Sequence, residues 1–280
     1  LFAEKAQLPL IRRALIVGKQ QGGSEMELNL SGKTVLITGG SKGIGLACAG
    51  VFAAEGCGLH LAARKEPDLQ EAKERIESKY GVSVKIHPVD LSNGDQARAL
   101  AGSCPDIDIL VNNAGAIPRG DLWQIDEAAL RRAWDLKVFG YINLCRAVYP
   151  QMKSRGKGVI INVIGAAGQR PRMGYIAGGM GNASLMALCT ALGAGSLKDG
   201  IRVVGVNPGL IKTQRLLSLL QSGAQAKFND PDRWQELMPT DPPPGDPDDI
   251  ASVVAFLASE RAGYITGTVV TADGGVTAMM

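Results

Sequence analysis

The stretch TVLITGGSKGIG, residues 34–45, decides how this chain folds. Its first five residues form a short apolar run typical of a buried strand, and a helix-length pattern follows Gly43. Glycines separate the two because the backbone there must turn tightly and approach a ligand without a Cβ atom in the way. A helix that begins near Gly43 directs its free N–H groups toward phosphate. The stretch therefore predicts a dinucleotide-binding turn made of Gly39, Ser41, Lys42, Gly43, Ile44 and Gly45.

Short apolar runs of this kind recur along the chain and alternate with helix-length stretches such as 44–55 and 69–79. Each run is rich in β-branched residues and is short enough for a fully buried strand. This alternation predicts an α/β fold: a single doubly wound, Rossmann-type domain with a seven-stranded parallel sheet and helices on both faces. The expected strands are 34–38, 59–63, 84–89, 107–112, 159–163, 202–206 and 268–272.

Composition narrows the function classes. The chain has 280 residues, of which 45% are hydrophobic, so it can bury a large core. Its formal charge is +3, with acidic and basic residues mixed along the length and no dense Lys/Arg block. We therefore expect no nucleic-acid partner. No apolar run reaches the roughly 18 residues that span a bilayer, so no membrane partner is expected either.

Two segments lie outside the regular alternation. Residues 1–25 precede Met26, and we expect an N-terminal extension or tag that is not part of the domain at 26–280. Residues 212–247 follow the sixth strand, begin with amphipathic leucines and end in a proline-rich stretch. Long excursions of this kind are usually lids or disordered linkers, and the position after the carboxyl end of a strand favours a lid.

Cysteine and histidine usage argues against disulfides and metals. The five cysteines are scattered without a CxxC pair, which predicts reduced, buried thiols and a cytoplasmic location. The only two histidines, His60 and His87, each lie inside an expected strand and are interpreted as packed side chains. No short-range ligand spacing such as HExxH occurs, so no metal site is expected.

The end of the second strand reads AARK, residues 62–65. An NAD site normally places an acidic side chain here for the ribose hydroxyls, but this chain has Ala63 followed by Arg64. Arg64, with Lys42 from the glycine turn, suits a 2′-phosphate, which predicts NADP in preference to NAD. The alternative is that Arg64 and Lys65 are ordinary solvated charges.

With these motifs in order, the chain resembles the short-chain dehydrogenase/reductase family from about Leu28 to Gly275. The resemblance implies that Asp90 contacts adenine, that the NNAG turn lines the adenosine ribose, and that the segment after NPG borders the nicotinamide. It also implies a homodimer or homotetramer. The matching motifs are TGGSKGIG (38–45), Asp90-Leu91, NNAG (112–115), NPG (207–209) with Thr213, and DGG (273–275). The cofactor-binding residues implied in this way are Asp90, Leu91, Asn112, Ala114, Gly115, Pro208, Gly209, Ile211 and Thr213.

The family's four catalytic residues are not found at their expected positions. The family uses an asparagine, a serine, a tyrosine 13 residues after the serine, and a lysine four after the tyrosine. This chain has Lys137, Gly165, Gly178 and Asn182 at those positions, and both spacings are kept. Shifting the alignment to make Tyr175 the family tyrosine puts Gly179 at the lysine position and Asn162 at the serine position, so no shift restores the set.

A rearranged proton donor is the sharper hypothesis. Residues 175, 178 and 182 share one face of a helix, so Tyr175 can place its phenol in the space that Gly178 leaves. Lys137 would lower the pKa of that tyrosine, as the family lysine does. Asn182 or Asn162 would donate a hydrogen bond in place of the serine. The alternative is that Tyr175 is a half-buried aromatic residue and Lys137 a helix-surface cation.

The predicted function is an NADP-dependent oxidoreductase acting on a carbonyl or alcohol. Leucines of the 212–247 segment, with Trp234, Ile117 and Met173, suggest a small apolar substrate. A protein that binds the nicotinamide nucleotide without catalysis is the alternative. A lyase, isomerase or dehydratase on the same fold has no positive support in the sequence.

Overall fold

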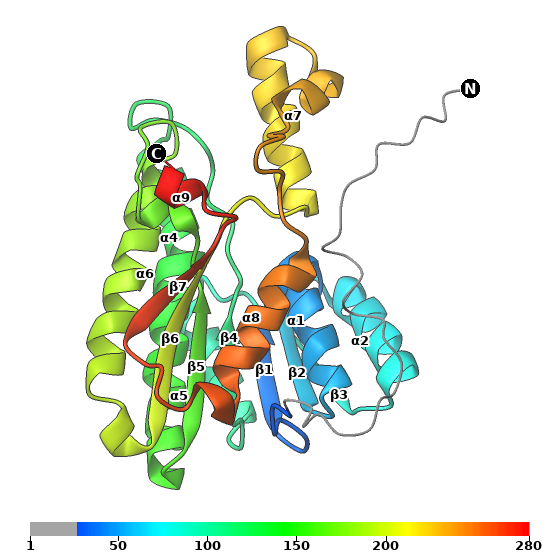
Figure 1. Ribbon diagram of the computed structural model, residues 1–280, viewed down its shortest axis with the longest axis vertical. Coiled ribbons are helices and arrows are strands. Elements are labelled where there is room, and N and C mark those ends of the chain that lie inside the picture. The colour runs from blue at the N-terminus through cyan, green and yellow to red at the C-terminus, as the bar shows by residue number, and fades with distance from the viewer. Residues whose placement is uncertain (1–26, 280) are drawn as a thin grey trace.

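The computed structural model describes residues 27–279, so the expected extension at 1–25 lies outside the described residues. Seven parallel strands form one sheet in the order β3-β2-β1-β4-β5-β6-β7 (Figure 1). The predicted fold class is therefore confirmed, and each expected strand is present within a few residues. The strands are β1 Thr34–Thr38, β2 Gly58–Ala63, β3 Val84–Pro88, β4 Ile109–Asn112, β5 Gly158–Val163, β6 Ile201–Pro208 and β7 Thr268–Ala272.

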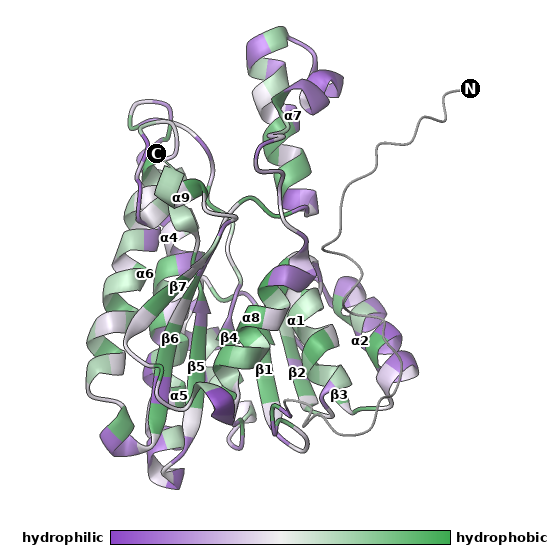
Figure 2. Ribbon diagram, viewed as in Figure 1, coloured by the Kyte–Doolittle hydropathy of each residue, from purple (hydrophilic) through white to green (hydrophobic). Residues whose placement is uncertain are grey.

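Helices cover both faces of the sheet. The face that carries Val35 and Ile37 packs against α1 (Gly43–Ala54), α2 (Glu66–Tyr80) and α8 (Pro247–Ala258). The face that carries Leu36 packs against α3 (Gly94–Ser103) and α5 (Gly140–Arg155). Figure 2 shows the strands mostly in green, because most residues on both sides of a covered parallel sheet are apolar. The chain reverses from strand to helix at the carboxyl edge of the sheet, where the predicted site residues gather.

Shorter elements connect the strands and helices. Helix α4 (Glu127–Trp134) runs through a π-helical turn, η1 (Asp135–Phe139), into α5. Turn η2 (Ala166–Gly168) follows β5, η3 (Leu197–Asp199) precedes β6, and η5 (Glu260–Ala262) follows α8. The short helix α9 (Val276–Met279) ends the described chain.

Helix α6 (Ile176–Ala194) is long and apolar enough, by length and composition alone, to cross a membrane. The expectation that no segment reaches this length therefore did not hold. In the structure α6 is a core helix: it packs on β6 and β7, and its Leu185 and Cys189 are fully buried beside Tyr141. A buried core helix can have the same length and apolar composition as a membrane-spanning helix.

The predicted lid segment forms two packed helices. Helix α7 (Gln214–Phe228) and the 3-10 segment η4 (Pro231–Leu237) lie against each other and stand away from the sheet (Figure 1). Leu216 and Leu220 are buried within this pair. Thr213 caps α7, since its Oγ1 accepts a hydrogen bond from the Leu216 amide at 3.3 Å.

Candidate active site

The glycine turn after β1 has the backbone that its sequence predicts. Gly39 and Gly43 have φ values of 64° and 55°, in the left-handed region that side chains with a Cβ rarely adopt. A Cβ on Gly45 would lie 2.1 Å from the Gly39 carbonyl oxygen. Helix α1 begins at Gly43, so its first amide groups face the turn. The turn thus forms a backbone cradle that fits a pyrophosphate.

The end of β4 is joined to the end of β1. Thr38 Oγ1 accepts hydrogen bonds from the amides of Asn113 and Ala114 at 2.8 Å and 3.0 Å, and Asn113 Nδ2 donates to the Thr38 carbonyl at 3.0 Å. This brings Ala114 and Gly115 beside the glycine turn. Asn112 differs from the others, because its side chain is fully buried and donates to Asn162 Oδ1 at 2.9 Å inside the sheet. Its side chain therefore faces the interior of the sheet.

The segment after β6 crosses the same turn. A Cβ on Gly43 would lie 3.2 Å from Thr213 Cγ2, so Thr213 lies directly against the glycine turn. Pro208 is buried, and Ile211 is 8% exposed. The Gly209 amide donates to the Ala272 carbonyl at 3.1 Å. The residues that the resemblance assigns to the nicotinamide side are therefore adjacent to those assigned to the pyrophosphate.

The two predicted phosphate-binding cations differ in their surroundings. Lys42 Nζ forms an ion pair with Asp68 Oδ2 of α2 at 2.8 Å. Arg64 is exposed after β2, and within residues 27–279 no hydrogen bond or ion pair is found for its guanidinium. Asp90 follows β3. Its Oδ1 accepts hydrogen bonds from the Ser92 amide at 3.0 Å and the Ser92 hydroxyl at 2.8 Å, which fix the orientation of the carboxylate. Leu91, next to it, is buried.

Lys137 lies in the π-helical turn η1, and such wide turns are frequent at functional sites. Its side chain crosses the NNAG turn: a Cβ on Gly115 would lie 2.6 Å from Lys137 Cδ. The ammonium donates to the Ile164 carbonyl at 2.6 Å, just beyond β5. Burial, with the nearby Arg215 charge, lowers the pKa of Lys137 to about 8. Lys137 is therefore a half-buried amine whose pKa lies well below its ordinary value.

The ring of Tyr175 occupies the space beside Gly178. A Cβ on Gly178 would lie 2.1 Å from Tyr175 Cε1 and 2.2 Å from Cζ, so the ring fills the place of a side chain at 178. This is the packing that the hypothesis required. The expected effect on the pKa was wrong, however: burial raises the pKa of Tyr175, and the charges that oppose the rise belong to Arg215 and Arg119. Lys137 instead directs its ammonium to the Ile164 carbonyl.

Asn182 and Asn162 are placed differently. Asn182 is 4% exposed, and its Nδ2 donates to the Gly165 carbonyl at 3.2 Å, while its Oδ1 is buried without a partner among the described residues. That oxygen is an acceptor able to take a ligand hydroxyl. Asn162 is fully buried, and its Nδ2 donates to Cys189 Sγ at 3.2 Å. Of the two candidates for the serine's hydrogen bond, Asn162 therefore already uses its amide inside the core, and Asn182 is the one that remains.

Sequence reasoning missed two arginines that surround Tyr175. Arg215 lies in the first turn of α7 and donates to the Ile117 carbonyl after the NNAG turn. Arg119 follows in the same loop and also acts on the phenol. A cation in the first turn of a helix opposes the helix dipole, and this unfavourable placement was the available signal that Arg215 has another role.

The fold and the carboxyl-edge site together define a dinucleotide-binding protein of the doubly wound class. A sequence profile described as "Enoyl-(Acyl carrier protein) reductase" matches residues 39–277. The chain belongs to the short-chain dehydrogenase/reductase family and is an NAD(P)-dependent oxidoreductase of that family.

Three relatives illustrate the match. The chain is 30% identical over 254 residues to "Dehydrogenase/reductase SDR family member 4" of Caenorhabditis elegans, covering 89% of this chain and 96% of the relative. It is 30% identical over 251 residues to 3-oxoacyl-[acyl-carrier-protein] reductase FabG of Chlamydia muridarum, and the match covers 88% of this chain and 98% of the relative. The structure of L-sorbose reductase from Gluconobacter frateurii, complexed with NADPH and L-sorbose, matches with a TM-score of 0.82 and 32% identity over 89% of this chain and 98% of that one.

Proposed function

We propose that this protein is an NADP-dependent oxidoreductase that interconverts a carbonyl and an alcohol with an atypical acid/base site. In this site Lys137, Tyr175 and Asn182 replace the usual catalytic set. The observation that carries the proposal is the half-buried Lys137 side chain, which packs against Gly115 of the NNAG turn, donates to the Ile164 carbonyl and has a pKa of about 8. A general acid works best when its pKa lies near the working pH.

The cofactor fits the residues present. The glycine turn is shaped for the pyrophosphate, and Arg64 is exposed without a partner among the described residues, which supports binding of the 2′-phosphate. The buried Asn182 Oδ1 is an acceptor for a hydroxyl. When bound, a nicotinamide supplies or accepts the hydride. The protein's own contribution is to hold the substrate and to move one proton.

Proton transfer is assigned to Lys137. In the reducing direction its Nζ gives a proton to the carbonyl oxygen while the carbonyl carbon accepts hydride; in the oxidising direction the neutral amine takes that proton back. The phenol of Tyr175, whose pKa is raised by burial, stays protonated at neutral pH and donates a hydrogen bond that orients the same oxygen. This division of roles follows from the two pKa shifts, because the amine titrates near pH 8 and the phenol does not.

The substrate we propose is a small molecule with an apolar body and an anionic group. Met173, which is 65% exposed, supplies apolar surface for it. Arg119 and Arg215 place positive charge near Tyr175, and the Arg215 charge also acts on Lys137. Cations gathered in a cleft favour a carboxylate or phosphate on the ligand.

The test is turnover of NADPH with a panel of carbonyl compounds, each keto acid paired with its methyl ester. We expect oxidation of NADPH, with the keto acids favoured over their esters. Binding of NADPH without turnover of any compound would favour the non-catalytic alternative. Equal rates for acids and esters would remove the anionic group from the proposal.

Arg64→Ala tests the cofactor preference. We expect the KM for NADPH to rise about 10- to 100-fold, which corresponds to the roughly 1.5–3 kcal/mol of a charge-assisted hydrogen bond, with NADH little affected. Lys65→Ala, at the next exposed cation, is the matched control and should change either KM less than twofold. If Arg64→Ala raises the KM for NADPH and the KM for NADH by the same factor, the assignment of Arg64 to the 2′-phosphate fails.

We also propose a homo-oligomer. The outward face of α6 carries only uncharged and mostly small exposed side chains, which suit close helix packing: Met180, Ser184, Ala187, Thr190, Ala191 and Ala194. Light scattering of the purified protein should give two or four times the 29.4 kDa chain mass. A single-chain mass at micromolar concentration contradicts the assembly.

The compartment we propose is the cytoplasm. All five cysteines are free and buried, as predicted from their scattered positions, and this suits a reducing environment. Fractionation of the native cell locates the protein directly, and recovery from an oxidising compartment would refute this.

A further inference from the structure

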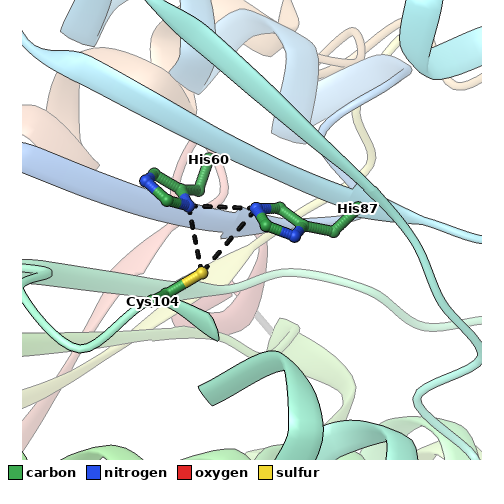
Figure 3. A group of neighbouring side chains, drawn as sticks. All are labelled: His60, His87 and Cys104. Atoms are coloured by element: carbon green, nitrogen blue, oxygen red, sulfur yellow. Dashed lines mark hydrogen bonds between the residues drawn. The ribbon is translucent and has the colours of Figure 1, made fainter. Parts of the chain in front are cut away.

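We propose that His60, His87 and Cys104 bind a late first-row transition metal ion, with Zn²⁺ as the ion to test (Figure 3). His60 lies in β2 and His87 in β3, two residues apart in register, so both side chains leave the same face of the sheet. Cys104 ends α3, which covers that face. The site lies on the β2–β3 side of the sheet and is separate from the proposed proton-transfer residues.

The three ligand atoms are spaced for one ion. His60 Nδ1 lies 3.0 Å from His87 Nε2 and 3.0 Å from Cys104 Sγ, and His87 Nε2 lies 3.7 Å from Cys104 Sγ. Tetrahedral Zn²⁺ bonds of about 2.0–2.1 Å to nitrogen and about 2.3 Å to sulfur separate the ligand atoms by about 3.3–3.6 Å. Shifts of a few tenths of an ångström in side chains therefore create the coordination geometry.

Hydrogen bonds alone do not account for this triangle. An imidazole nitrogen has one site in the ring plane, which holds either a proton or a lone pair. His60 Nδ1 is close to two partners at once, and one such site serves only one well-aligned hydrogen bond. A metal ion satisfies all three atoms together by accepting both nitrogen lone pairs and the thiolate.

Burial and donor type select the class of metal. His60 and Cys104 are 8% and 1% exposed, and His87 is half-buried, which leaves one side of the cluster open. Two imidazoles and one thiolate suit zinc, cobalt, nickel or copper rather than magnesium or calcium. The described residues place no fourth His, Cys, Asp or Glu in the group, so water completes the coordination. Binding replaces the thiol proton with the metal and releases that proton to solvent.

The bound ion would cross-link three elements. Strand β2 leads to Arg64 and β3 leads to Asp90, and both residues belong to the adenosine side of the proposed cofactor site. Joining β2, β3 and the end of α3 would stabilise the native chain, since a ligand that binds only the folded state raises its stability. The role assigned to the metal is therefore a structural clamp.

The experiment uses the full chain with any affinity tag removed, because His60 and His87 are its only histidines. Chelator-treated protein is titrated with Co²⁺ and then Zn²⁺. We expect one Co²⁺ per chain with cobalt–thiolate absorption, displacement by Zn²⁺, and a rise in Tm. Loss of a ligand in Cys104→Ala or His87→Gln should weaken Zn²⁺ binding at least 100-fold, because replacing a residue that only hydrogen-bonds to a metal ligand already costs about 10–100-fold.

Cys48→Ala is the matched control, because Cys48 is an equally buried thiol outside the cluster. It should keep the cobalt–thiolate band and the affinity. Because His87 is only half-buried, His87→Gln should disturb the fold less than Cys104→Ala does. A normal circular dichroism spectrum of His87→Gln would show that weaker metal binding does not come from unfolding. The proposal is overturned if the wild type binds neither ion tightly, or if folded His87→Gln binds as the wild type does.

Discussion

Replacing Lys137 with methionine is expected to lower kcat for carbonyl reduction by about 10²- to 10⁴-fold, the usual contribution of a general acid. The side chain keeps its length and apolar stem and loses only the ammonium that donates to the Ile164 carbonyl. Because burial makes this charge costly, the variant should unfold at the same temperature as the wild type or higher. Steady-state kinetics with calorimetry checks both outcomes.

The pH dependence follows from the same group. The pKa of Lys137 is about 8 in the folded protein and 10.5 in its ordinary state, so the unfolded chain binds more protons between these values. The stability contribution of Lys137 therefore rises as pH increases from about 8 to 10.5. The rate of reduction should fall as pH rises through about 8, and this limb should vanish in Lys137→Met.

Lys198→Met, at an exposed lysine in η3, is the control and should leave the rate unchanged. A Lys137→Met protein that retains most of its kcat, with the alkaline limb intact, would show that the proton comes from elsewhere.

The second large effect is expected from Gly178→Ala. The added Cβ would lie 2.1–2.2 Å from the Tyr175 ring, so the phenol must leave its position. We expect kcat to fall about 100-fold, as in Tyr175→Phe, and stability to fall by about 1–3 kcal/mol from overpacking. Kinetics and denaturant unfolding of both variants test this.

Gly174→Ala provides the comparison, since a Cβ there meets nothing within 4 Å. In the double variant Tyr175→Ala with Gly178→Ala the clash is gone, so the effect of the second change on stability should shrink while activity stays low. If Tyr175→Phe turns over substrate at the full wild-type rate, the phenol has no catalytic role.

The fold was predictable because buried parallel strands leave a strong local signal. TVLIT and TVVTA match β1 and β7 residue for residue, and the glycine turn adopts the positive φ values that its composition requires. The packing of Tyr175 against Gly178 was also accessible, because helical spacing fixes which residues share a face.

Charge and ligand geometry were less accessible because they depend on contacts between distant segments. Nothing near Lys137 in the sequence indicates that its ammonium reaches Ile164, or that Arg215 lies close enough to help lower its pKa. The cluster of His60, His87 and Cys104 is assembled from two strands and a helix end, so no short-range spacing reveals it. The interior position of Asn162 likewise depends on Cys189, which comes from a different helix.

The wide turn Asp135–Phe139 has a consequence for the helices around it. Successive residues of an α-helix are rotated by about 100° about its axis, so one additional residue in a turn changes which side chains of the following helix face the protein. After this turn Phe139 points outward, 49% exposed, and Gly140 is the residue pressed against the Leu91 carbonyl. The wide turn thus shifts the rotational phase of α5 relative to α4, although the chain between them is continuous.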